Sequence, residues 1–313
     1  MNFQQLRSVR ETLRRNFNLT EVALALHTSQ PGVSRQIREL EDELGVEIFV
    51  RAGKRLTGLT EPGRQVLPIV EQLLRGADSL RQASADFASK GSGNLRIAAT
   101  HSQARYALPP VVRDFRLQHP DVTLHMHQGS PQQIARMLLD GEADVGIATE
   151  ALTQYSELVA LPCYRWTHTV LTPPDHPLAR EARQGQVLTL ERLAQFPIIT
   201  YETGYTGRSH IDQAFAKAGL GVDLVLVAMD ADVIKTYVEL GLGVGIVAAI
   251  AYDEERDKHL ASIDVRHLFA DNMTRLAVRR DVYLRDYVYD FIATFAAPLT
   301  RAMVDQSREL VGA

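Results

Sequence analysis

The chain carries the stretch SQPGVSRQIRELEDELG at residues 29–45. Ser29 can cap a helix N-terminus, and Pro31 stands in the first turn, where its missing N–H leaves no bond unmade. Apolar residues then recur at helical spacing, which predicts one buried stripe on a helix that ends at Gly45. The stripe consists of Val33, Ile37, Leu40 and Leu44. We therefore expect a helix whose opposite face is polar and basic.

Two helices are expected before this one. The first is amphipathic and carries Phe3, Leu6, Val9 and Leu13. The second begins at Asn18, which together with Glu21 has the form of a capping box, and it ends at His27-Thr28. Two short helices joined by a tight turn predict a helix-turn-helix, whose second helix enters the DNA major groove.

A hairpin with a basic tip is expected next. Apolar runs at 48–50 and 56–59 flank the sequence RAGKR at residues 51–55, which predicts a wing that contacts phosphates or the minor groove. In the major groove, Gln can bind adenine and Arg can bind guanine. The predicted DNA-binding residues are Gln30, Pro31, Ser34, Arg35, Arg38, Arg51, Lys54 and Arg55. Periodicity alone leaves open a plain three-helix core with a solvated charged face.

The distribution of charge agrees with a small DNA-binding module. The 313-residue chain has a formal net charge of −4, yet residues 1–64 hold ten basic against eight acidic side chains. The acidic excess therefore lies in the rest of the chain, and DNA contact is expected only at the N-terminus.

The sequence indicates a cytoplasmic protein. Residues 1–17 carry four arginines and no apolar run of signal-peptide length. No stretch reaches the ~18 apolar residues of a membrane span, so we expect no membrane partner. The single cysteine, Cys163, cannot form an intrachain disulfide, and we expect it to be a small buried residue.

A long helix is expected between the wing and the rest of the chain. Thr60 and Pro62 are typical of its start, and it continues to about residue 87. Its apolar stripe has no obvious intrachain partner, which favours a dimerising helix over one packed on its own chain. The stripe is Val66, Val70, Leu73, Leu74 and Ala77. The sequence SKGSGN at 89–94 reads as a linker. The expected domains are therefore 1–60, a helix at 61–90, and 91–313.

Strands and helices alternate in the third domain. Strands are expected at 95–99, 122–127 and 145–148 and helices at 108–118 and 132–139, a rhythm that predicts a parallel sheet. The first lobe is expected over about 94–162 and the second over about 163–267. The chain is then expected to return to the first lobe at 268–300, with a strand at 276–279 and a helix at 287–295. The expected fold is a winged helix-turn-helix and linker helix, followed by a two-lobed α/β sensor like the periplasmic binding proteins. In such α/β proteins a ligand binds at the carboxyl ends of the strands.

Polar side chains gather at those strand ends. Residues 100–103 read THSQ, Thr149 follows the 145–148 strand, and 200–209 read TYETGYTGRS. Neutral hydroxyls and backbone N–H groups of this kind suit an oxyanion or a carboxylate. Ordinary helix caps and strand ends are the alternative.

Residues 19–60 resemble the LysR-type transcriptional regulators. The resemblance rests on SQPGVSRQI at 29–37, LE at 40–41, LG at 44–45, FVR at 49–51 and LT at 59–60. The rest of the chain resembles the CysB-like subfamily, the activators of the cysteine regulon and of sulfonate utilisation. That resemblance rests on THSQARYALP at 100–109, HMHQG at 125–129, IATEAL at 147–152, TGRS at 206–209 and DADVIKTY at 230–237.

The resemblance implies function and partners. It implies a homotetramer, a dimer of dimers, that binds double-stranded promoter DNA, acts on RNA polymerase and controls sulfur-assimilation genes. It also implies a small effector and no cofactor: an acetylserine, sulfate, thiosulfate or adenosine phosphosulfate. The expected effector-binding residues are Thr100, Ser102, Gln103, Thr149, Trp166, Glu202, Thr203 and Thr206. Ser102 stands where Thr is usual, and Glu202 stands where enteric members carry Thr. Whether the role concerns cysteine or sulfonates stays open.

No enzymatic signature stands out. A nucleophile elbow and a phosphate-binding loop are absent, and GLGVG at 241–245 lacks dinucleotide-binding spacing. His125 and His127 lack a nearby third ligand, so we expect no metal site. The run EERDK at 254–258 is expected to be a solvated face. An enzyme and a solute-binding protein are the rivals from other classes.

Overall fold

The computed structural model describes residues 1–53, 55–88, 92–205 and 207–309. The chain divides into two compact units. The first holds residues 1–88 with 281–283, and the second holds the remaining described residues. Among the described residues, no helix is both long enough and apolar enough to cross a membrane.

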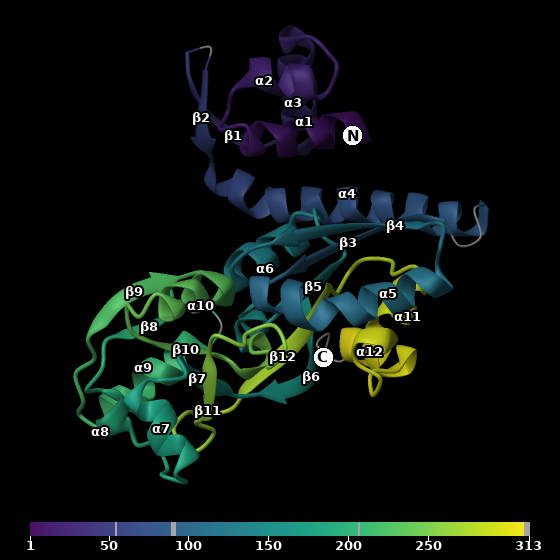
Figure 1. Ribbon diagram of the computed structural model, residues 1–313. Coiled ribbons are helices and arrows are strands. Elements are labelled where there is room, and N and C mark those ends of the chain that lie inside the picture. The colour runs from purple at the N-terminus through teal and green to yellow at the C-terminus, as the bar shows by residue number, and fades with distance from the viewer. Residues whose placement is uncertain (54, 89–91, 206, 310–313) are drawn as a thin grey trace. The chain divides into compact units, whose positions relative to one another are not determined.

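The first unit is a winged helix-turn-helix followed by a long helix (Figure 1). Its elements are α1 (Phe3–Arg14), α2 (Leu19–Ala25), α3 (Gln30–Leu44), β1 (Phe49–Ala52), β2 (Arg55–Leu59) and α4 (Glu61–Ala88). The expected caps are present: the Ser29 side chain accepts from the Gly32 N–H at 3.2 Å, and Asn18 accepts from two N–H groups of α2. Gly45 ends α3 with φ +70°, a left-handed conformation that favours glycine.

One apolar core joins α1, α2, α3 and the first half of α4. Val33, Ile37 and Leu40 of the expected α3 stripe contribute to it, whereas Leu44, expected to be buried with them, is 41% exposed near the end of the helix. Val70 and Leu74 of α4, each only 2% exposed, also belong to this core. Val66 packs against the same core, so the expectation that the α4 stripe lacks an intrachain partner is wrong for Val66, Val70 and Leu74. Among the described side chains of α4, the large apolar ones that are exposed are Ile69, Leu73 and Leu80.

The second unit contains two five-stranded sheets. The first has the order β4-β3-β5-β12-β6. Its strands are β3 (Gly93–Ala99), β4 (Val122–Gln128), β5 (Val145–Ala148), β6 (Leu158–Trp166) and β12 (Asn272–Arg279). β3 is parallel to β4 and β5, whereas β12 is antiparallel to β5 and β6. The helices of this lobe are α5 (Leu108–Gln118), α6 (Pro131–Leu139), α11 (Asp286–Phe295) and α12 (Arg301–Glu309).

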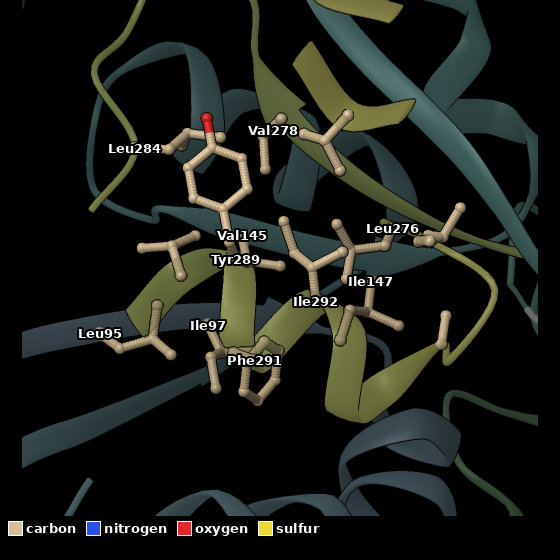
Figure 2. Close-up of a cluster of buried hydrophobic side chains, with 14 of the residues drawn as sticks. Leu95, Ile97, Val145, Ile147, Leu276, Val278, Leu284, Tyr289, Phe291 and Ile292 are labelled. Atoms are coloured by element: carbon tan, nitrogen blue, oxygen red, sulfur yellow. The ribbon is translucent and has the colours of Figure 1, made fainter. Parts of the chain in front are cut away.

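The core of the first lobe lies between its sheet and the returning C-terminal helices. Figure 2 shows Phe291 and Ile292 of α11 pointing toward Ile97 and Ile147 of the sheet. All four side chains are fully buried. The segment that returns from the second lobe therefore completes the first.

The second sheet has the order β11-β7-β10-β8-β9. Its strands are β7 (His168–Thr172), β8 (Ile198–Tyr201), β9 (Leu224–Ala228), β10 (Val244–Ala248) and β11 (Ala261–Asp264). Its helices are α7 (Pro177–Arg183), α8 (Leu190–Leu193), α9 (Arg208–Lys217) and α10 (Ala231–Glu239). The chain passes between the sheets twice, at Thr167 and between Asp264 and Asn272. This confirms the expected two-lobed α/β architecture, and β6 continues in the first sheet beyond residue 163.

Two local expectations need correction. Asp257 belongs to the run that was expected to be solvated, yet it is 8% exposed and accepts from the buried Lys235 ammonium at 2.9 Å. The last strand of the first lobe was expected at 276–279 but begins at Asn272, because polar residues at its start are buried by the neighbouring strand β6.

Candidate functional site

A hollow of about 820 Å³ lies on the helix-turn-helix. It brings together six of the eight side chains expected to contact DNA: Gln30, Pro31, Ser34, Arg35, Arg38 and Arg51. Arg55 is exposed on β2, and Lys54 lies outside the described residues. The start of α3 and the base of the wing therefore form one surface, as expected for a recognition helix that enters the major groove.

The Arg35 and Arg38 side chains of α3 form hydrogen bonds within the helix and remain accessible to DNA. Arg35 is 80% exposed and donates from Nε to Glu39 at 2.7 Å, and Arg38 donates to the Ser34 hydroxyl at 3.1 Å. The Arg35 hydrogen bond lowers the pKa of Glu39. Because the Arg35–Glu39 ion pair lies on an exposed face, it contributes little stability, and DNA can replace Glu39 as the partner of Arg35 at little cost.

Arg51 is fixed more firmly. Its guanidinium donates to Glu41, a side chain that is 6% exposed. The same carboxylate accepts from the backbone N–H groups of Ile48 and Phe49 at 2.8 and 3.1 Å. One buried carboxylate thus joins α3 to the start of the wing.

The second candidate site lies at one edge of the first sheet. β3 and β5 are adjacent and parallel, so Thr100 and Thr149 leave the sheet at the same edge. β12 is antiparallel to both β5 and β6, which places its first residue, Asn272, and the last residue of β6, Trp166, at that edge too. The sheet therefore brings together three of the expected effector-binding residues and adds a fourth polar residue.

Gln103 is fixed across the same strands. It is 5% exposed, donates to the Thr274 hydroxyl at 3.1 Å and accepts from the Tyr164 hydroxyl. Ser102 is 2% exposed and lies beside Tyr201 of the second lobe. Burial raises the pKa of Tyr201 to about 12, so its hydroxyl stays protonated.

The second lobe contributes the segment after β8. Glu202 and Thr203 are exposed, whereas Arg208 is buried and donates to the Tyr201 carbonyl and, at 2.7 Å, to Asp212. Thr206 lies outside the described residues. Two of the three effector-binding residues expected from this lobe, Glu202 and Thr203, thus directly follow the carboxyl end of β8.

A polar cluster joins the lobes next to this edge. Tyr106 and Arg105 donate to Asp232 at 2.7 and 3.3 Å, and Lys235 lies 3.4 Å from the same carboxylate. Ligand atoms of Asp232, Asp230 and His101 lie within 4.8 Å of one another. Two cations and a hydroxyl already satisfy Asp232, so this cluster fits an interlobe link better than a metal site.

Sequence reasoning missed Asn272, Thr274, Tyr164 and Tyr201. Asn272 and Thr274 precede the stretch that had a strand pattern, and nothing in the local sequence pairs them with β6. Only the register of β6 and β12 places them beside Trp166 and Gln103.

Two family descriptions match the chain. "Bacterial regulatory helix-turn-helix protein, lysR family" matches residues 3–64, and "LysR substrate binding domain" matches residues 88–299. The chain is 57% identical over 304 residues to the HTH-type transcriptional regulator SsuR of Burkholderia cenocepacia, and the match covers 97% of each. It is 53% identical over 307 residues to the HTH-type transcriptional regulator CysB of that organism, with coverage of 98% and 97%. The crystal structure of the cofactor-binding domain of the Cbl transcriptional regulator matches with a TM-score of 0.66 and 47% identity over 72% of this chain and 96% of that one.

Proposed function

Because the chain belongs to the LysR family of helix-turn-helix transcriptional regulators, we propose that it controls sulfur-assimilation genes in response to a small effector. Family membership decides against the enzyme and solute-binding alternatives. The sulfur role draws on the identity of more than half of the aligned residues with SsuR and with CysB. Such a protein acts on promoter DNA in the cytoplasm.

The observation that carries the effector proposal is the meeting of Thr100, Thr149 and Trp166 at one sheet edge. These side chains offer hydrogen-bond donors without a full charge. A dehydrated anion is well held by several neutral donors. The effector classes that fit are a sulfur oxyanion, namely sulfate, thiosulfate or adenosine phosphosulfate, and the carboxylate of an acetylserine.

Assembly is part of the proposal. A regulator that binds a two-fold symmetric operator needs two helix-turn-helix units. Ile69, Leu73 and Leu80 of α4 are 57%, 43% and 70% exposed, and they are the apolar surface that we assign to a dimer. Two such dimers would form the tetramer, with RNA polymerase as the further partner.

Calorimetry on wild type and Thr100→Val tests the effector site. Valine keeps the shape of threonine and removes the hydroxyl, and a hydrogen bond to a charged group contributes ~1.5–3 kcal/mol. Wild type should bind at least one of sulfate, thiosulfate, adenosine phosphosulfate and the acetylserines, and Thr100→Val should bind it at least tenfold more weakly. Thr123→Val, on the exposed face of β4, is the matched control. Equal affinity in wild type and Thr100→Val would place the site elsewhere.

The choice between cysteine genes and sulfonate genes needs a separate experiment. The chain is similar to both SsuR and CysB, at 57% and 53% identity. We favour neither role on that difference. Footprinting on the promoters of both gene groups from the source genome, with and without effector, distinguishes them.

A further inference from the structure

Two carboxylates line the hollow on the helix-turn-helix that is expected to face DNA. Glu39 and Asp42 of α3 lie along it together with Arg35 and Arg38. DNA is a polyanion, so an acidic side chain on such a surface repels the phosphates near it and weakens binding. The two carboxylates differ in what they contact, and that difference points to a role for Glu39.

Glu39 belongs to a chain of hydrogen bonds that ends at Arg35. The buried Gln5 side chain of α1 accepts from the Asn2 backbone N–H at 2.8 Å and donates to Glu39 Oε2 at 3.2 Å. The other oxygen, Oε1, accepts from Arg35 Nε at 2.7 Å. The Arg35 bond, and after it the Gln5 bond, lower the pKa of Glu39, so the carboxylate stays charged. Asp42 has no hydrogen-bond or ion-pair partner among the residues that the structure describes.

The Arg35 guanidinium keeps its terminal donors free. Within the described part of the chain only its Nε is bonded, and the N–H groups of its terminal nitrogens have no partner there. In the major groove guanine offers the acceptors N7 and O6, and an arginine fork binds both. The bond to Glu39 therefore leaves open the donors that suit a guanine.

We propose that Glu39 is a positioning residue that makes Arg35 select guanine. This deepens the proposed function and rests on it. With Nε held, the guanidinium presents its terminal fork, and less side-chain freedom is lost when a base binds. Guanine leaves the Arg35–Glu39 pair in place. A phosphate on the same fork would lie close to the Glu39 carboxylate, and the two negative charges repel each other. The pair thus favours the base over the backbone.

The test measures selectivity rather than affinity. The wild-type full chain first selects its preferred duplex from a random library. Each G·C pair of that duplex is then replaced by A·T, and fluorescence anisotropy at one fixed salt concentration gives the ratio of the two dissociation constants. Arg35→Ala identifies the guanine concerned, because the ratio there should fall from about tenfold to near one. A loss of folded protein lowers the affinity for every duplex alike and leaves this ratio unchanged.

Variants of the two carboxylates separate positioning from charge. Glu39→Leu should lower the ratio at that guanine to about twofold, because the Arg35 side chain is no longer held. Glu39→Gln keeps an oxygen acceptor for Nε, and its ratio should stay within about twofold of wild type. Asp42→Leu is the matched control, since it removes a carboxylate from the same hollow. It should strengthen binding to every duplex and leave the ratio as in wild type.

The outcomes distinguish this inference from the proposed function. A wild-type ratio in Glu39→Leu, or an equal fall in Asp42→Leu, would overturn the role of Glu39 alone. A positioning residue acts only through its partner, so adding Glu39→Leu to Arg35→Ala should change no base preference further. A further change would show that Glu39 contacts a base itself, which would also overturn positioning. If Arg35→Ala altered the ratio at no guanine, the inference would fail and DNA binding would stand. If wild type selected no sequence, the proposed function would fail and the inference with it.

Discussion

The Tyr106 hydroxyl donates a hydrogen bond to Asp232 at 2.7 Å, and this bond joins the two lobes of the second unit. Tyr106 belongs to a short π-helical segment, Gln103–Ala107, that begins at an expected effector-binding residue. π-helical turns occur frequently at functional sites. Asp232 stands in the first turn of α10. The segment that contacts the effector site thus also carries the link to the second lobe.

Asp232 should make stability depend on acid. Burial alone would raise its pKa, but the Tyr106 hydrogen bond and the Lys235 charge outweigh burial and hold the pKa below its ordinary value of 3.8. A group with a lowered pKa in the folded state contributes stability that is complete above its unfolded pKa and is lost as pH falls through the folded one. Wild type should therefore lose more stability than Asp232→Asn between about pH 5 and pH 3. Thermal unfolding across this range measures it, and parallel curves for the two proteins would contradict the prediction.

Glu41 should be a major contributor to the stability of the helix-turn-helix. Glu41→Leu leaves the N–H groups of Ile48 and Phe49 and the Arg51 guanidinium without their acceptor. Since Arg51 is 30% exposed and can reach water, we expect ~2–3 kcal/mol of destabilisation rather than the full cost of a broken buried ion pair. Urea unfolding measures this loss. Glu61→Leu, which removes a 71% exposed partner of Arg64, should change stability by less than ~0.5 kcal/mol.

Arg35 and Arg55 should differ in what they do to DNA binding. Arg35 lines the hollow at the start of α3, so Arg35→Ala should cost ~1–3 kcal/mol on the operator and relax sequence preference. Arg55 is exposed on the wing, so Arg55→Ala should weaken operator and random DNA alike and reduce the salt slope by ~0.9. Fluorescence anisotropy over a salt series gives both quantities. Equal loss on specific and random DNA for Arg35→Ala would reverse the assignment.

We expect Leu73 of α4 to be buried in a dimer interface. It is 43% exposed on α4, whereas Leu74 beside it is buried in its own chain. Leu73→Glu would place a charge in an apolar interface, which is strongly disfavoured, so sedimentation should show smaller species and operator affinity should fall. Leu117→Glu, at a residue 79% exposed on α5, is the control. An unchanged oligomer with Leu73→Glu would remove α4 from the interface.

Local signals in the sequence predicted the helix ends of the DNA-binding unit. Ser29, Asn18 and Gly45 mark helix ends through bonds to neighbours a few residues away, so their roles are visible in the sequence itself. The same reasoning failed where a partner is distant along the chain. Asp257 looked solvated because its partner Lys235 lies on another element, and the apolar residue Val70 looked unpartnered because its core comes from α1 to α3.

The residues of the candidate effector site differ in the same way: some could be predicted from the local sequence, and others depend on partners far along the chain. Thr100 and Thr149 were predictable because each follows an apolar strand whose end is evident, and parallel strands end at one edge. Asn272 was not, because its strand begins with polar residues and its burial comes from Trp166 and Gly207. A polar residue inside a strand has the sequence pattern of a loop until its neighbours are known.

Glu202 should have little effect on effector affinity. Its side chain is exposed, so water and salt screen its charge from a ligand at the sheet edge. Glu202→Thr should therefore change the dissociation constants of O-acetylserine and sulfate by less than twofold, measured by calorimetry in low salt, where a charge effect would be largest. A carboxylate that faced the ligand would act oppositely on the two, because O-acetylserine carries an ammonium and sulfate carries only negative charge. Weaker O-acetylserine binding with tighter sulfate binding would thus place Glu202 in the site, and a parallel shift of both would assign it to shaping the loop before α9.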